Sequence, residues 1–294
     1  PDYETKTTYT ATVTASDGVN TKTQDITVNV TNVNDNSPSF TSSATFTAPE
    51  NQTAIGTVTA TDADGDDVTF TVSGTELAIT SAGVLTFASA PDYEIKTSYT
   101  ATVTASDGVN STTQDITINV TNVNDVAPEF TSEATFSAAE NQTAIGTVTA
   151  TDADGDGILY TISGSDITIN SSSGVIAFTS APDYETKTTY TATVTASDGL
   201  NSTTQDITVN VTNENDNSPS FTSEATFSAA ENQTAIGTVM ASDADGDDIS
   251  YSISGSDITI NSSTGVIAFA SAPDYETKPV YTATVTASDG VNSS

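Results

Sequence analysis

One four-residue string, Pro-Asp-Tyr-Glu, recurs through this sequence at a nearly fixed interval. It begins at Pro1, Pro91, Pro182 and Pro273, so successive copies lie 90, 91 and 91 residues apart. The 35 residues that start at Pro91 match those that start at Pro182 at all but five positions, which indicates duplication of a whole unit. A period near 90 is too long for a solenoid turn and matches an independently folding domain. We therefore expect several similar domains in series.

The boundaries between these domains are expected at polar segments that contain a proline. Such segments occur at 34–38, 124–128 and 215–219. Because the chain begins inside a repeat, it has the character of an interior excerpt of something longer. The predicted division is a C-terminal part of a repeat (1–36), two complete repeats (37–126 and 127–217) and a repeat lacking its last strand (218–294).

Apolar residues within each repeat alternate with polar ones. From Tyr99 to Ala105, and again from Ile116 to Val120, every second residue is apolar and the intervening ones are mostly Thr. This period of two is typical of half-buried antiparallel strands, and no stretch has helical periodicity. The other strands expected in this repeat are 44–48, 55–61, 68–72, 77–80 and 83–87. Seven short strands in about 90 residues predict an all-β, immunoglobulin-like sandwich.

The charge balance and the missing residue types exclude several classes of function. The chain has 39 acidic and 5 basic residues, a formal net charge of −34, and no His, Cys or Trp. Without His or Cys there is no Ser-His-Asp triad, no cysteine nucleophile, no zinc finger and no iron–sulfur site. Nucleic acid and anionic membrane surfaces would repel so acidic a chain. No apolar run reaches the length of about 18 residues that spans a membrane.

The acidic residues recur at five places in each repeat rather than being spread evenly. Most of these places are expected at strand ends or in loops, where clustered carboxylates repel one another unless a cation is bound. Calcium takes six to eight such oxygen ligands, whereas magnesium prefers fewer carboxylates and more water. In the first complete repeat the five places are Glu50, Asp62 with Asp64, Asp92 with Glu94, Asp107, and Asp125 in the linker.

These motifs, in this order, resemble the calcium-binding motifs of cadherin repeats: Pro-Glu-Asn at 49–51, Asp-Ala-Asp at 62–64, Asp-Tyr-Glu at 92–94, Ala-Ser-Asp at 105–107 and Asn-Val-Asn-Asp at 122–125. The resemblance covers essentially the whole chain. It implies tandem cadherin-like, seven-stranded Greek-key sandwiches in an extended rod. It also implies about three Ca²⁺ in each complete linker, held by both neighbouring repeats.

The resemblance assigns candidate metal ligands to three linkers. For the first linker they are Asp2, Glu4, Val33, Asn34, Asp35, Asn36, Asp62, Asp64 and Asp107, and the upstream Glu would precede Pro1. For the middle linker they are Glu50, Asp92, Glu94, Val123, Asn124, Asp125, Val126, Asp152, Asp154 and Asp198, with Val123 and Val126 acting through their carbonyls. For the third linker they are Glu140, Asp183, Glu185, Glu214, Asn215, Asp216, Asn217, Asp243, Asp245 and Asp289.

Charge arithmetic agrees with this assignment. The middle linker gathers seven acidic side chains, which roughly three Ca²⁺ would nearly neutralise. The family's carbonyl ligand after the Asp-Ala-Asp pair has no clear match in the short acidic loop at 65–67. Some of these motifs also have purely structural interpretations. Asp-Ala-Asp-Gly could be only a turn, and Tyr93 is expected to pack at the core or at a strand edge. Lys96, Lys187 and Lys278 are expected to balance local charge. Paired carboxylates that recur in every repeat do not indicate an enzyme.

The favoured function is a structural extender for cell adhesion. The near-identical, Thr-rich, acidic repeats without Cys or Arg resemble the extender regions of large bacterial surface adhesins, where calcium would stiffen a rod that projects a binding domain. Two alternatives stay open: self-association into an extracellular filament or matrix, and an array of carbohydrate-binding modules. The expected partners are neighbouring repeats through calcium, and other copies of the chain in the filament alternative. Extracellular, cell-surface localisation follows from the weak calcium affinity typical of extracellular modules.

Overall fold

The computed structural model describes all 294 residues, and its regular structure consists of β-strands alone. The chain divides into two compact units, Pro1–Val126 and Ala127–Ser294. No helix of the length and apolar character needed to cross a bilayer is present.

Residues 37–126 of the first unit form a sandwich of two main sheets. One sheet has four strands in the order β4-β11-β10-β7, and the other has three in the order β5-β9-β8. A short antiparallel pair, β3 with β6, accompanies them. The strands are β3 (Ser39–Phe40), β4 (Thr45–Pro49), β5 (Ala54–Thr57), β6 (Ala60–Thr61), β7 (Thr69–Val72), β8 (Leu77–Ile79), β9 (Val84–Phe87), β10 (Ser98–Ser106) and β11 (Ser111–Thr121).

The period-two pattern of the sequence places the core between these sheets. In β10, Val103 and Ala105 are fully buried while the Thr residues between and beside them are only partly covered. In β11, Ile116, Ile118 and Val120 are buried in the same alternation. Apolar surface removed from water in this way contributes about 25 cal/mol per Å², so the alternation fixes which face of each strand points inward. The all-β sandwich expected from the sequence is confirmed.

The expected strand at 55–61 is one of the places where the structure differs. It is interrupted: β5 pairs with β9 and β6 pairs with β3, with an irregular register between Ala54 and Gly56. The break lets the chain pass from one pairing partner to another while Val58 stays buried at 1 % exposure. The two-residue strand β3 is too short to leave a periodic signal in the sequence.

A one-residue difference in length between the two complete repeats falls in a turn. The turn that leads into β9 ends at Gly83, and the longer turn that leads into β18 (Val175–Phe178) ends at Gly174. Both glycines have positive φ, and a Cβ at either would lie 2.2 or 2.1 Å from a backbone oxygen, that of Val58 or Val148. The turn therefore tolerates a change of length but needs glycine at its end.

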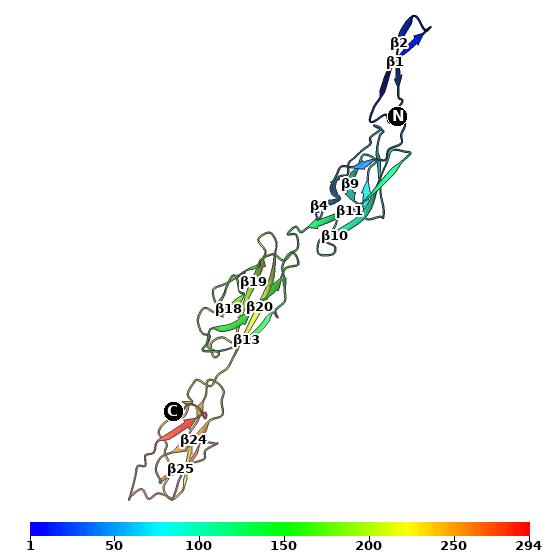
Figure 1. The fold of residues 1–294 in the computed structure, drawn as a ribbon. Coiled ribbons are helices and arrows are strands. Elements are labelled where there is room, and N and C mark those ends of the chain that lie inside the picture. The colour runs from blue at the N-terminus through cyan, green and yellow to red at the C-terminus, as the bar shows by residue number, and fades with distance from the viewer. The chain divides into compact units, whose positions relative to one another are not determined.

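Residues 127–217 of the second unit repeat the same architecture. The sheets have the orders β13-β20-β19-β16 and β14-β18-β17, with β12 paired to β15; β13, β18, β19 and β20 are labelled in Figure 1. The core includes Ile176, Val194 and Val209, all fully buried. The strands are β12 (Glu129–Phe130), β13 (Thr135–Ala139), β14 (Ala144–Thr147), β15 (Ala150–Thr151), β16 (Leu159–Ile162), β17 (Ile167–Ile169), β18 (Val175–Phe178), β19 (Thr189–Ser197) and β20 (Ser202–Thr212).

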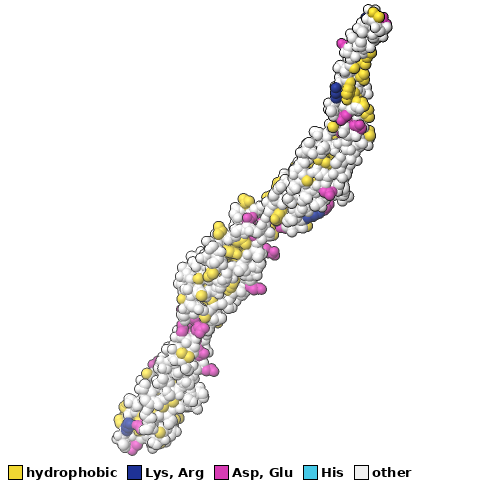
Figure 2. All heavy atoms as spheres, viewed as in Figure 1, with side chains coloured by type: hydrophobic (Ala, Val, Ile, Leu, Met, Phe, Trp, Pro, Cys, Tyr) yellow, Lys and Arg dark blue, Asp and Glu magenta, His cyan; other side chains and the backbone are white.

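The two ends of the chain carry fewer strands. Residues 1–36 contain only the antiparallel hairpin of β1 (Thr8–Ser16) and β2 (Thr21–Asn29), and its apolar side chains are exposed (Figure 2). Residues 218–294 have no counterpart of β20, and their apolar interior opens into a cavity of about 580 Å³. The strands there are β21 (Ser220–Phe221), β22 (Ala235–Thr238), β23 (Ala241–Ser242), β24 (Ser250–Ile253), β25 (Ile258–Ile260), β26 (Val266–Phe269) and β27 (Val285–Ser288).

Candidate metal centre

A buried carboxylate lies just after β13 in the second unit. Glu140 is only 3 % exposed. Its Oε2 accepts a hydrogen bond from the backbone N–H of Tyr184 at 2.7 Å, and its Oε1 accepts one from the N–H of Glu214 at 2.8 Å. Glu140 thereby fastens the Asp-Tyr-Glu turn and the start of the linker to the same strand end. These two charge-assisted hydrogen bonds offset part of the cost of burying the carboxylate.

Four carboxylates converge around this anchor. Glu140, Glu185, Asp216 and Asp245 each offer one oxygen, and these oxygens lie within 4.8 Å of one another. Glu140 and Glu185 precede the linker, Asp216 lies in it, and Asp245 follows β23 in the next repeat. Acidic side chains greatly outnumber basic ones on the visible surface as well (Figure 2). Four negative groups so close together repel one another, which favours a bound cation.

Asp245 is held by the linker through its own hydrogen bonds. Its Oδ2 accepts from the backbone N–H groups of Asp216 at 3.0 Å and Asn217 at 2.8 Å. Its Oδ1 accepts from the side-chain amide of Asn217 at 2.8 Å. These bonds, the Asn217 side chain first, lower the pKa of Asp245 below its usual value. Desolvation raises the pKa of Glu185, and the charges of Glu140 and Asp245 add to the rise.

Two further carboxylates of the third linker have an oxygen that nothing in the protein satisfies. Asp289 uses Oδ1 to accept from the N–H groups of Val291 and Asn292, and Asp243 uses Oδ1 to accept from the N–H of Asp245. The Oδ2 atoms of Asp243 and Asp289 are buried and have no hydrogen-bond partner. A buried carboxylate oxygen without a partner is costly unless it ligates a cation. The donor set therefore fits a hard divalent ion.

The first linker, within the first unit, repeats this arrangement. Glu4, Asp35 and Asp64 bring three carboxylate oxygens within 4.8 Å of one another. Asp64 Oδ2 accepts from the N–H of Asp35 at 3.0 Å and from that of Asn36 at 2.8 Å. The backbone bond from Asn36 is the largest cause of the lowered pKa of Asp64. The Oδ2 of Asp107 is buried without a partner, as in its counterpart Asp289.

The ligands expected for the middle linker are divided between the two units. In the first unit, Glu50 is 3 % exposed and accepts from the N–H of Tyr93 at 2.6 Å and of Val123 at 2.8 Å. Asn51 donates its side-chain amide to Asp125. In the second unit, a buried oxygen of Asp152, Oδ2, has no hydrogen-bond partner. In each unit, the residues expected to contribute to the middle linker thus make contacts like those of the equivalent residues in the other linkers.

Some of the expected ligands have other roles in the structure. Asp183 accepts from the N–H and hydroxyl of Thr186, so its carboxylate stabilises its own turn, and Asp2 does the same with Thr5. Asn34 and Asn215 accept, through Oδ1, the side-chain amides of Asn110 and Asn292. The remaining assigned residues lie in the same turns and linkers: Val33, Asp92, Glu94, Asn124, Val126, Asp154, Asp198 and Glu214.

One set of acidic residues was missed in the sequence interpretation. Asp66 lies within 4.8 Å of Asp62 and Asp64 through their carboxylate oxygens, and Asp156 joins Asp152 and Asp154 in the same way. The third Asp of the Asp-Ala-Asp-Gly-Asp string therefore offers a carboxylate close to where the family's carbonyl ligand had no match. The available signal was the two-residue spacing of the three Asp side chains, of which the first two are assigned as ligands above and the third only as part of a short acidic loop.

Part of this chain matches a known domain family, and most of it is similar to known proteins. The profile of the cadherin domain matches residues 134–212. The chain is 33 % identical over 308 residues to "Protocadherin-like wing polarity protein stan" of Drosophila melanogaster, covering 90 % of the chain and 9 % of that protein. It is 32 % identical over 303 residues to "Protocadherin Fat 4" of Homo sapiens, covering 89 % of the chain and 6 % of that protein. The chain thus spans less than a tenth of the length of these relatives.

Solved structures show the same fold. "Protocadherin Gamma B2 extracellular cadherin domains 3-6" superimposes with a TM-score of 0.70 at 25 % identity, covering all of this chain and 82 % of that one. Mouse Cadherin-23 EC22-24 superimposes with a TM-score of 0.66 at 24 % identity, covering 87 % of this chain and 94 % of that one. The folds of those cadherin domains and of the repeats described above are alike.

Proposed function

Because this chain is a run of tandem cadherin repeats, we propose that it is a calcium-stiffened extracellular segment of a cell-adhesion protein. Cadherin repeats are adhesion domains and not enzymes. The proposed division is into parts 1–36, 37–126, 127–217 and 218–294. In this role the repeats act as a spacer, and the calcium ions determine how far and how rigidly the spacer reaches.

The group of four carboxylates at the third linker is the observation that carries this proposal. It takes Glu140 and Glu185 from one repeat, Asp216 from the linker and Asp245 from the next repeat. An ion bound there would contact three consecutive parts of the chain at once. Its binding energy would oppose any rotation that separates the two repeats, since rotation would withdraw ligands.

The proposed metal is Ca²⁺, at about three ions in each complete linker. At the third linker the holding residues would be Glu140, Glu185, Asp216, Asp245 and the partner-free oxygens of Asp243 and Asp289. By sequence equivalence the middle linker would use Glu50, Glu94, Asp125, Asp152, Asp154 and Asp198. Flexible oxygen cages rich in carboxylates suit Ca²⁺ better than Mg²⁺, which retains more of its water.

The resemblance of the sequence to bacterial surface adhesins receives no support from the comparisons. The relatives described above are animal proteins of the protocadherin and Fat type, so the proposal does not extend to a bacterial surface adhesin. Extracellular placement at the cell surface remains part of the proposal. Weak calcium sites of this kind fill in extracellular fluid and stay empty in cytosol.

Small-angle X-ray scattering of the whole chain tests the stiffening. In calcium we expect one extended conformation with a sharply defined maximum dimension. In chelator we expect a broad distribution of dimensions, because the carboxylates repel one another and nothing bridges them. Magnesium at the same concentration serves as the control and should resemble the chelator. Identical scattering curves in calcium and chelator would contradict the proposal.

A further inference from the structure

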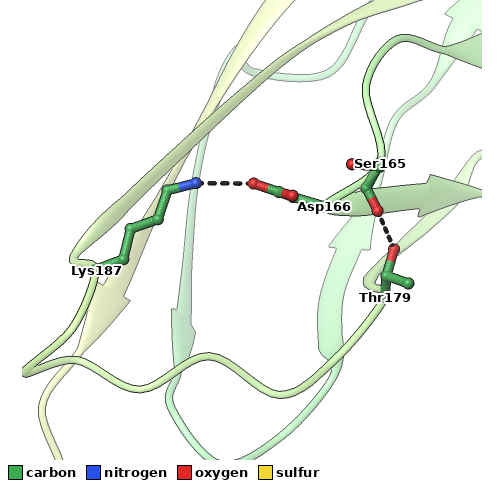
Figure 3. Close-up of polar contacts among 4 residues, drawn as sticks. All are labelled: Ser165, Asp166, Thr179 and Lys187. Carbon is green, nitrogen blue, oxygen red and sulfur yellow. Dashed lines mark hydrogen bonds and ion pairs between the residues drawn. The ribbon is translucent and has the colours of Figure 1, made fainter.

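The segment 179–188 connects β18 to β19 and carries Glu185, one of the four clustered carboxylates. Both ends of this segment are fastened to the same dipeptide, Ser165-Asp166, just before β17 (Figure 3). At its start, Thr179 donates its N–H to the Asp166 carbonyl at 2.8 Å and its hydroxyl to the Ser165 carbonyl at 2.6 Å. At its end, the Lys187 ammonium pairs with Asp166 Oδ2 at 2.8 Å. The segment that carries Glu185 is therefore tied near both ends to the same dipeptide.

Lys187 is held on a second side by an aromatic ring. Its ammonium lies 4.0 Å from the centroid of the Tyr190 ring, and that ring packs edge-on against Phe178 with centroids 4.9 Å apart. Tyr190 belongs to the four-stranded sheet, whereas Asp166 precedes a strand of the three-stranded sheet. The cation–π contact restricts the lysine side chain, whose conformational freedom usually weakens an exposed ion pair. Lys187 also donates its backbone N–H to the Asp183 carbonyl, so the fixed side chain belongs to the turn itself.

The backbone bond, the ion pair and the aromatic contact recur in the other two repeats that contain this segment, whereas the residue equivalent to Thr179 is Ala there and donates no hydroxyl. Three of the five basic residues of a chain with net charge −34 are used in this way. In residues 37–126 the acid is Glu instead of Asp, yet the pair is kept, at 2.5 Å between Lys96 and Glu76. The counterparts are Lys96 with Glu76 and Tyr99, and Lys278 with Asp257 and Tyr281.

We propose that the Asp166–Lys187 pair is a clamp that positions Glu185 for cation binding at the third linker. The proposal rests on the proposed function, because it concerns the affinity of that same site. Two effects of Lys187 have opposite signs. As a nearby positive charge it would weaken calcium binding, whereas as a clamp it strengthens binding by holding the turn in its ligating geometry.

A charge-neutral double variant separates these effects. D166N/K187Q removes the pair from the full chain without changing the net charge. We expect calcium affinity at the third linker to fall about two- to fivefold, the range of an exposed ion pair. The shift of the ¹⁵N-labelled backbone amide of Glu214 during a calcium titration reports this site, because the other two linkers have Val at the equivalent position.

Two variants make the test specific. D166E copies the Glu found at position 76 and should keep the wild-type affinity. E76Q/K96Q removes the equivalent pair in residues 37–126 and should leave the Glu214 titration unchanged. A urea midpoint of D166N/K187Q in chelator equal to that of the wild-type chain would exclude general unfolding as the cause of the lost affinity.

The outcomes distinguish the clamp from the function on which it rests. Wild-type affinity in D166N/K187Q, or tighter binding in both K187Q and D166N/K187Q, would overturn the clamp and leave the calcium-binding function intact. A wild-type chain whose Glu214 amide ignores calcium would overturn the proposed function, and the clamp with it.

Discussion

Removing calcium from this chain should lower the midpoint of thermal unfolding by roughly 10 °C or more. With dissociation constants of about 10⁻⁴–10⁻³ M and about 10 mM Ca²⁺, each site stabilises the folded state by about 1.4–2.7 kcal/mol. Several sites occupy each linker, and about 1 kcal/mol moves the midpoint of a domain of this size by several degrees. Differential scanning calorimetry in calcium and in chelator measures the difference.

Two comparisons show whether coordination or simple screening causes this effect. Sodium chloride at matched ionic strength weakens repulsion among exposed carboxylates but coordinates none of them. It should recover only a small part of the calcium effect, and Mg²⁺ should recover little more. Equal midpoints in calcium and chelator, or full recovery by sodium chloride, would mean that the acidic groups do not bind ions specifically.

Replacing Glu140 by Gln should lower calcium affinity at the third linker at least tenfold, about 1.4 kcal/mol. Glu140 is 3 % exposed and accepts from two backbone N–H groups. A Gln side chain has only one oxygen, so its NH₂ group would face one of these donors and leave that donor unpaired. An unpaired buried donor costs about 1–3 kcal/mol of stability. The substitution also removes one of the four charges around the ion. Stability should therefore fall even in chelator, which metal loss alone would not produce.

Glu133→Gln is the matched control for this variant. Glu133 lies in the same repeat, is exposed, and undergoes the same loss of one charge. Urea unfolding in chelator and a calcium titration followed at the Glu214 amide should separate the two variants clearly. If E140Q and E133Q behaved alike in both measurements, the buried carboxylate would not be the anchor of the site.

The periodic strands were predictable because burial follows directly from alternation. The runs at 99–105 and 116–120 lie within β10 and β11, with Val103 and Ile118 fully buried. The run at 55–61 also alternates, yet it splits into β5 and β6 because the chain changes partner strand there. Periodicity gives the buried face of a segment, but it carries no information about which strand pairs with it.

The chemistry of the candidate site was visible in the sequence, whereas the partners of individual side chains were not. The expected packing of Tyr93 against the core is confirmed. Lys187 does balance a charge, but its partner is Asp166, 21 residues earlier, and not the neighbouring acidic motif. The third Asp of the Asp-rich loop and the two backbone donors to Glu140 depend on how the turns fold. Such contacts follow from tertiary structure and leave no local pattern.

Calorimetric titration of the chelator-stripped chain with calcium, and with magnesium as control, tests the central claim most directly. We predict uptake of about three Ca²⁺ for each complete linker, with far weaker binding of Mg²⁺. Little or no calcium uptake, or equal binding of the two ions, would contradict the account. The acidic motifs would then be turn residues of a β-sandwich array that no ion stiffens.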